Sequence, residues 1–247
     1  MNKELINDYN KQELERLLNK YNLSNEDKSL FLSIILPIFN HKEFQIRMNT
    51  NEFPHHGITS LVTHILCNAI FSFLIAKKKK YNIELATKIA MFHDLYELPW
   101  QNSDIKHKYF INKHGFMHPL EAAINAYSWF PECFTDSKTN ELILDGIIHH
   151  MWPFPVLSID ENTSFNNIEK YNNLPKDIKE IIISSSNRKC IVVKNEKISF
   201  CKPFSCEGKA IIIADKKVTI SSDKLGFYDT IALITGKNKK INNHTKK

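Results

Sequence analysis

Histidine and aspartate side chains are the residues of this 247-residue chain whose types could bind a metal ion. The adjacent pair His93 and Asp94 lies near the end of an apolar segment with helical spacing. Neighbouring residues of a helix point about 100° apart, so both side chains can share one ion only beyond the helix end. We therefore expect a metal site at a helix terminus. Further histidines and one late aspartate accompany the pair along the chain: His56, His64, His114, His118, His149, His150 and Asp215.

These residue types favour a borderline divalent metal. Imidazole and carboxylate groups suit ions such as Mn, Fe, Zn, Mg or Co, and the sequence does not distinguish among these metals. The five cysteines include no Cys-x-x-Cys pair, so we expect free thiols in a reducing compartment. A single histidine on an apolar face is more often a hydrogen-bonded core residue than a ligand. It is the number of histidines around the His-Asp pair that favours a metal site.

Helices must position these side chains, and the composition predicts an all-α fold. The chain is 43% hydrophobic, which is enough to bury a sizeable core, and it holds only 6 glycines and 9 prolines. Its apolar residues recur at helical rather than alternating spacing. We expect helices at residues 4–21, 25–39, 61–78, 83–98, 120–130, 140–151 and 208–219, followed by a last helix that ends near 235.

Residues 155–206 differ in character from the rest of the chain. Prolines and an Asn-rich stretch interrupt this segment, and two apolar runs at 191–193 and 197–200 predict a small β-hairpin. We expect a loop-rich insertion, peripheral to the helical core, whose shortening would preserve folding and change substrate preference. The expected organisation is N-terminal helices at 1–43, a metal-binding domain at 44–235 and a basic disordered tail at 236–247.

The formal charge of +6 does not by itself indicate a nucleic-acid partner. Much of the excess lies in Lys77–Lys80 and in the tail, which are more typical of solvated or disordered surface. The N-terminus lacks an apolar signal region, and the longest mainly apolar stretch, residues 65–76, is too short to cross a bilayer. We expect a soluble, cytoplasmic protein with no membrane partner.

Five short motifs surround the candidate ligands: HGxTSxxxH at 56–64, FHDL at 92–95, HGFxHP at 114–119, HMWP at 150–153 and ADK at 214–216. Together these motifs resemble the HD-domain superfamily of metal-dependent phosphohydrolases. The similarity is strongest to an uncharacterised bacterial subgroup, and it spans residues 44–222. This resemblance implies an all-helical HD-domain bundle.

The resemblance also implies a ligand set. His64, His93, Asp94 and Asp215 would bind one divalent ion. In dinuclear members two further histidines bind a second ion, and the aspartate of the pair bridges both ions. His118 and His150 match these two positions, with His149 as the competitor of His150. Whether the centre holds one ion or two stays open.

Hydrolysis of a small phosphate ester, with a nucleotide as the favoured substrate, is the activity that the resemblance implies. The interval between His150 and Asp215 is several tens of residues longer than in close relatives, so the substrate itself does not transfer. Surface exposure, core packing and turn formation are the competing explanations for most of the candidate residues around the metal. The candidates are Asp94, His114 and Lys216 for catalysis, and Arg47, His56, Lys216 and Trp152 for substrate binding.

Three other functions stay open at this point. A few superfamily members with the same ligand set are di-iron oxygenases, which carry out a different reaction. A metal-binding regulatory module without turnover is a second alternative, in which the insertion serves as a partner surface. A nucleic-acid-binding protein that uses the basic tail is the weakest of the three. A homo-oligomer is compatible with all of them.

Overall fold

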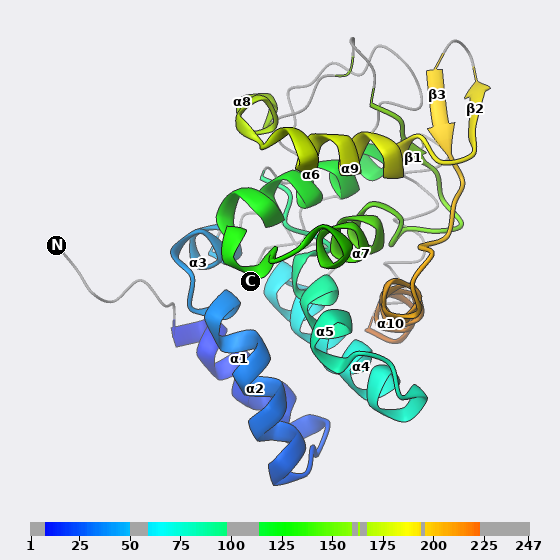
Figure 1. Cartoon of the computed structure of the whole chain (residues 1–247). Coiled ribbons are helices and arrows are strands. Elements are labelled where there is room, and N and C mark those ends of the chain that lie inside the picture. Colours follow the sequence, from blue (N-terminus) through cyan, green and yellow to red (C-terminus); the bar gives the residue numbers. More distant parts are fainter. Residues whose placement is uncertain are drawn as a thin grey trace, which may run out of the picture.

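Ten α-helices make up most of the residues described by this computed structural model, which are 8–49, 59–97, 114–159, 163, 167–193 and 196–222 (Figure 1). The side chains of residues 114, 196 and 220–222 are not described. The expected all-α class is confirmed. The helices are α1 (Asp8–Lys20), α2 (Asn25–Phe39), α3 (Lys42–Met48), α4 (Leu61–Lys79), α5 (Ile83–Phe92), α6 (His114–Trp129), α7 (Ser137–Ile148), α8 (Ile168–Asn173), α9 (Lys176–Ser186) and α10 (Cys206–Ser222).

Side-chain caps begin several of these helices where the sequence supplies Ser, Asn or Asp. Ser24 Oγ accepts a hydrogen bond from the backbone N–H of Asp27 at 3.1 Å and so caps α2. Asn82 caps α5 in the same way. A cap of this kind is worth about 1 kcal/mol, because it satisfies an N–H group that has no partner inside the helix.

The helix that carries the His-Asp pair is shorter than predicted. We expected it to run to residue 98, before Pro99, but α5 ends at Phe92. His93 is its C-cap, and its ring Nδ1 lies 2.7 Å from the carbonyl oxygen of Ala90. This side-chain bond satisfies one of the carbonyls left over at a helix end, so the chain turns here instead of at the proline. The pair was expected within the last turns of this helix, and it lies instead in the turn directly after it.

Other helix boundaries also differ from the prediction. The helix expected at 120–130 begins at His114 and contains Pro119, because a proline near the first turns removes few backbone hydrogen bonds. Asp136 starts α7 at residue 137 rather than 140, by accepting from the N–H groups of Lys138 and Thr139 at 3.0 Å each. Helix α3 was not predicted. The last predicted helix and the basic tail lie outside the described residues.

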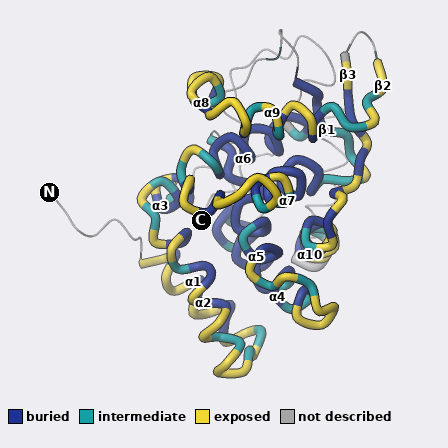
Figure 2. The backbone as a smooth tube through the Cα atoms, in the orientation of Figure 1, coloured by how far each residue is buried: buried dark blue, intermediate teal, exposed yellow. Residues whose placement is uncertain are grey.

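The centre of the molecule is the helix pair α4 and α5, and most of their residues are buried (Figure 2). Helix α10 packs on α4, α5 and α7, while α1 packs on α4 and α2 packs on α5. Each fully buried Phe, Leu or Ile side chain contributes about 1.5–3 kcal/mol relative to an exposed one. The helices that carry the candidate ligands therefore share one core, which fixes their ends relative to one another.

Helix α4 is long enough, and apolar enough, to cross a membrane by length and composition alone. It runs for 19 residues, which is longer than the apolar stretch seen in the sequence. However, 67% of its most apolar window is buried inside the protein. Such burial is typical of the core helix of a soluble protein.

Two glycines bring α7 close to its neighbours. A Cβ atom at Gly146 would lie 2.9 Å from two carbon atoms of the buried Ile89 side chain on α5. A Cβ atom at Gly208 would lie 3.1 Å from the Cα atom of Gly146, so α10 crosses α7 at these two residues. Larger side chains would push the three helices apart. The glycines thus let α5, α7 and α10 converge near the candidate site.

The segment 155–206 carries more regular structure than its composition predicts. The predicted hairpin is confirmed as the antiparallel strands β2 (Cys190–Val193) and β3 (Glu196–Ser199). An unpredicted strand, β1 (Val156–Leu157), pairs with β3 to give the order β1-β3-β2. Helix α9 packs on α7, and its Ile178 and Ile182 belong to the main core. The segment is therefore not peripheral to the helical core. That its shortening would preserve folding stays a prediction.

Candidate metal centre

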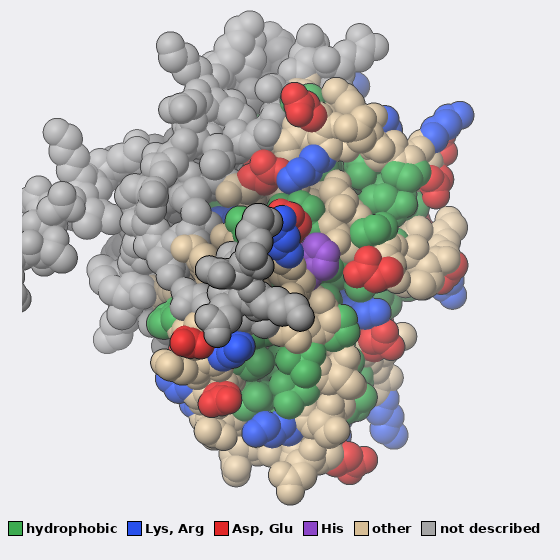
Figure 3. Space-filling model, turned by 90° about the vertical axis from the view of Figure 1, so that its left-hand side faces the viewer, with side chains coloured by type: hydrophobic (Ala, Val, Ile, Leu, Met, Phe, Trp, Pro, Cys, Tyr) green, Lys and Arg blue, Asp and Glu red, His purple; other side chains and the backbone are tan. Residues whose placement is uncertain are grey.

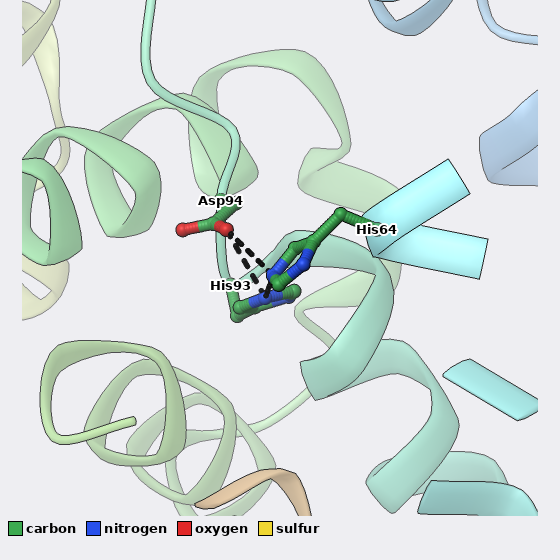
Figure 4. Close-up of side chains that lie close together, drawn as sticks. All are labelled: His64, His93 and Asp94. Atoms are coloured by element: carbon green, nitrogen blue, oxygen red, sulfur yellow. Dashed lines mark hydrogen bonds and ion pairs between the residues drawn. The ribbon is translucent and has the colours of Figure 1, made fainter. Parts of the chain in front are cut away.

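Asp94 lies between two groups of histidines, one facing each oxygen of its carboxylate. Its Oδ2 atom lies 3.2 Å from Nε2 of His64 and 3.2 Å from Nε2 of His93, and the three side chains point toward one another (Figure 4). Its Oδ1 atom lies 3.2 Å from Nε2 of His118 and 3.6 Å from Nε2 of His150. All five residues are buried. The two groups therefore share one carboxylate, with one oxygen in each.

Five helices deliver these side chains. His64 lies in the first turn of α4, while His93 and Asp94 form the turn after α5. His118 comes from the interior of α6, and His150 comes from the turn after α7. The fifth helix, α10, supplies Asp215 from its interior, as the helix predicted at 208–219 implies.

Asp215 completes the group around His64. Its Oδ1 atom lies 3.1 Å from Nε2 of His64 and 3.9 Å from Nε2 of His93. Its side chain is 14% exposed, whereas those of His64 and His93 are 1% and 0% exposed. The first group is thus two imidazoles and two carboxylates, and it opens toward solvent on the Asp215 side.

Hydrogen bonds to backbone carbonyls orient two of the rings. His93 donates from Nδ1 to the Ala90 carbonyl, and His150 donates from Nδ1 to the Ile147 carbonyl, each at 2.7 Å. Because a carbonyl oxygen only accepts, Nδ1 carries the proton and Nε2 is left as the ligand atom. This is the arrangement that metal-binding histidines use to fix their tautomer.

Burial and neighbouring charges shift the pKa values of the imidazoles and carboxylates of this site in different directions. Burial disfavours a charge on His64, yet hydrogen bonds to Asp215 and then Asp94 raise its pKa to about 9. The same contact with His64 holds the pKa of Asp215 well below its usual range, although burial alone would raise it. Without a metal, His64 is therefore a cation bound by two carboxylates, in the place where a metal cation would bind.

His150 shows the opposite behaviour. Burial lowers its pKa to about 3, and the neighbouring His93 and His118 oppose a further positive charge. Its Nε2 atom lies 3.2 Å from Nε2 of His118, so two ring nitrogens face each other in a buried space. A bound cation fits this arrangement, because both nitrogens and Asp94 Oδ1 can point at it.

Asn68 is a residue of this centre that the sequence reasoning missed. It lies one helical turn after His64 on α4 and is fully buried. Its Nδ2 atom lies 2.9 Å from Nε2 of His64, 3.3 Å from Nε2 of His93 and 3.4 Å from Oδ1 of Asp215. Its Oδ1 atom has no hydrogen-bond partner among the described residues. The i, i+4 spacing from His64 was the signal that could have identified it.

His149 points away from the centre. Its Nε2 atom donates to the Ser185 carbonyl at 3.0 Å and lies 3.6 Å from Asp145, which is its i, i+4 neighbour. Burial, together with the charge of Arg188, lowers the pKa of His149 to about 4. Of the two adjacent histidines, the structure places His150 in the metal-binding group and His149 against α9.

The Arg47 side chain is buried rather than exposed on the surface. Its guanidinium lies 4.6 Å from the centroid of the Tyr96 ring, and its Nε donates to the Tyr96 carbonyl. Burial lowers its pKa, whereas the charge of Asp94 opposes that shift. Its assignment to substrate binding stays a prediction.

Lys216 follows Asp215 in the sequence, and Trp152 comes two residues after His150. The Lys216 amine lies 4.7 Å from the centroid of the half-buried Trp152 ring. His56 lies outside the described residues, as does the side chain of His114, so their predicted roles stay predictions.

The geometry is that of a site for one or two cations. His64, His93 and Asp94 could hold one metal ion, and Asp94, His118 and His150 could hold another, since the ligand atoms of each group lie within 4.8 Å of one another. Imidazole nitrogen and carboxylate oxygen suit Mn, Fe, Zn and Co.

Comparison of the chain with protein-family models, with curated proteins and with solved structures finds no match. The functional interpretation therefore depends on the side chains of the site and on the resemblance seen in the motifs.

Proposed function

We propose that the protein is a metal-dependent phosphohydrolase that acts on a small phosphate ester, with a nucleotide as the favoured substrate. The observation that supports this proposal best is the position of Asp94, whose two carboxylate oxygens each face a pair of histidine nitrogens. A bridging carboxylate is what a two-metal hydrolase needs to hold its ions about 3.5–4 Å apart. The motif resemblance to HD-domain proteins, which involves the same residues, points to the same activity.

The roles of the residues follow from their positions. Bound divalent ions would activate water and polarise a phosphoryl oxygen. His64, His93, His118, His150 and the two aspartates would hold them, while the carbonyl-bonded rings keep their Nε2 atoms aimed at the centre. Lys216 lies on the open side, next to Asp215, where it can neutralise charge that develops on the phosphoryl group.

Anaerobic phosphate release tests the proposal. The purified protein, loaded with Mn(II), should release phosphate from at least one member of a panel of nucleotides and simple phosphate esters. Asp94→Asn should abolish this activity, whereas Glu141→Gln, an exposed carboxylate change on α7, should leave it within twofold. Activity without added metal after dialysis against a chelator would contradict the proposal.

The anaerobic assay, together with a separate measurement of oxygen uptake, distinguishes hydrolysis from oxygenation. Hydrolysis requires only Lewis-acid ions, so oxygen should be irrelevant and redox-silent Mn(II), Mg(II) or Zn(II) should suffice. No phosphate release, together with iron-dependent oxygen uptake, would overturn the proposal in favour of a di-iron oxygenase. Metal binding with neither reaction would favour a regulatory module.

One face of the molecule, shown in Figure 3, has no continuous basic surface. Its described Lys and Arg side chains are interspersed with Asp and Glu. The basic tail lies outside the described residues. Non-specific nucleic-acid binding needs several phosphate contacts from clustered cations. A small phosphorylated molecule is the better candidate.

A further inference from the structure

Two lysines contact the same tryptophan ring beside the metal centre. The Nζ atom of Lys202 lies 4.0 Å from the centroid of the Trp152 ring, and the Nζ atom of Lys216 lies 4.7 Å from it. An ammonium group at this distance from an indole is attracted by the negative face of the ring. Trp152 is thus contacted by two positive charges, although these charges repel each other.

The chain fixes the position of Lys202 from both sides. Its backbone carbonyl accepts a hydrogen bond from Arg188 at 2.7 Å, and Arg188 in turn contacts the buried carboxylate of Asp145 at 2.8 Å. The other oxygen of that carboxylate accepts from the N–H of Phe204 at 2.9 Å. The loop between β3 and α10 is therefore tied to α7, the helix that precedes His150.

Lys216 and Trp152 each lie close in the sequence to a candidate metal ligand. Lys216 follows Asp215 on α10, and Trp152 comes two residues after His150. Neither lysine amine forms an ion pair with a carboxylate in the part of the chain that the structure describes. Two lysine amines on one ring, with no ion pair among the described residues, can bind an anion.

We propose that Lys202, Lys216 and Trp152 bind a second phosphoryl group of the substrate, next to the phosphoryl group held at the metal centre. This inference rests on the proposed function and narrows its substrate class to molecules with two phosphoryl groups. A lysine amine binds phosphate oxygens as a point charge, so two such amines match the charge of a phosphoryl dianion. Lys202 comes from the 155–206 segment, which thereby takes part in substrate selection.

The chain offers a matched control for this site. Lys217 lies on the same helix as Lys216, and its amine sits 4.1 Å from the centroid of the Phe71 ring. It has the same charge and a similar contact with an aromatic ring, but its ring is not Trp152. Lys217→Met and Lys202→Met remove the same charge, so any difference between them reports position rather than net charge.

Calorimetric titration with methylenediphosphonate tests the proposal, with methylphosphonate as the probe that carries a single anionic group. The P–C–P link is not hydrolysed, so both probes can be titrated into Mn(II)-loaded protein, where one phosphonate group would bind at the metal centre and only the diphosphonate has a second group for the two lysines. Wild-type protein should bind the diphosphonate at least about tenfold more tightly than the monophosphonate. Lys202→Met should lose about tenfold in diphosphonate affinity, as expected for a charge-assisted hydrogen bond. Lys217→Met should change it by less than twofold.

Equal losses of diphosphonate affinity in Lys202→Met and Lys217→Met would overturn the proposed site. So would a wild-type protein that shows no preference for the diphosphonate. Circular dichroism of Lys202→Met checks that the fold is kept, and Lys202→Arg, which retains the charge, should restore most of the affinity. The outcomes also separate this proposal from the proposed function. Lys202-dependent binding without hydrolysis of any phosphate ester would leave the site standing and remove the activity. Hydrolysis without that dependence would do the reverse.

Discussion

At the scale of a single residue, the contacts of Asp94 explain why a His-Asp dipeptide can organise a whole site. Its carboxylate lies within 3.2–3.6 Å of four imidazole nitrogens that come from four different helices. A buried carboxylate in this position needs positive charge nearby, because burial of an unpaired charge costs several kcal/mol. In the structure, the protonated His64 supplies that charge, and a bound metal would replace it.

Metal binding should therefore release a proton from His64. Its pKa of about 9 lies above the value for a free histidine, so its ring is protonated at every pH below about 9. A metal ion needs the unprotonated Nε2, so Mn(II) binding at pH 7 should release about one proton per ion at this group. Metal affinity should rise with pH and level off above about pH 9. Calorimetry in buffers of different ionisation enthalpy measures the release, and zero protons at pH 7 would contradict the assignment.

Asn68 should control metal affinity without controlling the fold. Asn68→Leu keeps the volume but removes the amide that lies 2.9–3.4 Å from three candidate ligand atoms. We expect a loss of about 10- to 100-fold in Mn(II) affinity, the usual effect of removing a group that orients metal ligands. Ser72→Ala, one turn further along α4 and also buried, is the control and should bind metal normally. Unchanged metal affinity in Asn68→Leu would remove this residue from the site.

The elements show which parts of the fold the sequence could predict. Helices with a strong apolar face were found, and the hairpin at 190–199 was found from its two short apolar runs. Helix ends were less predictable, because tertiary contacts decide them. The hydrogen bond from His93 to the Ala90 carbonyl lies at the end of α5, which stops at Phe92 and not at residue 98, the residue before Pro99.

The sequence predicts which residues could bind metal, but not how these residues are arranged in space. The motifs identified His64, His93, Asp94, His118, His150 and Asp215, and the structure brings these six together. They could not identify Asn68, because an asparagine in an apolar helix carries no motif of its own. Lys202 was also missed. Its nearness to Trp152 depends on the loop between β3 and α10, which no local pattern specifies.

Asp145 should hold the 155–206 segment against the helical bundle. Its buried carboxylate accepts from Ser185 Oγ at 2.8 Å, from Arg188 at 2.8 Å and from the N–H of Phe204 at 2.9 Å. Asp145→Ala leaves these donors without their acceptor, so the free energy of unfolding should fall by about 3 kcal/mol. Urea denaturation measures the change. Glu141→Ala, an exposed change on the same helix, should stay within about 0.5 kcal/mol, and an equally small effect in Asp145→Ala would show that the segment is held elsewhere.

At the scale of the whole molecule, one continuous core joins the helices that supply the ligands. Helices α4, α5, α7 and α10 pack on one another, and the glycines at 146 and 208 let three of them approach closely. Interiors packed at this density deform little. The ligand atoms are thus positioned before any ion binds, and the 155–206 segment adds its own buried residues to the same core.

Metal stoichiometry tests the central claim, that Asp94 is shared by two metal groups. Protein treated with a chelator and titrated with Mn(II) should bind two ions per chain, as counted by elemental analysis after gel filtration. His118→Ala should keep one ion, because it belongs to one group only, whereas Asp94→Ala should lose both. Circular dichroism should show the helical fold unchanged in both variants. One ion or none in the wild type, or two ions retained in Asp94→Ala, would contradict the account.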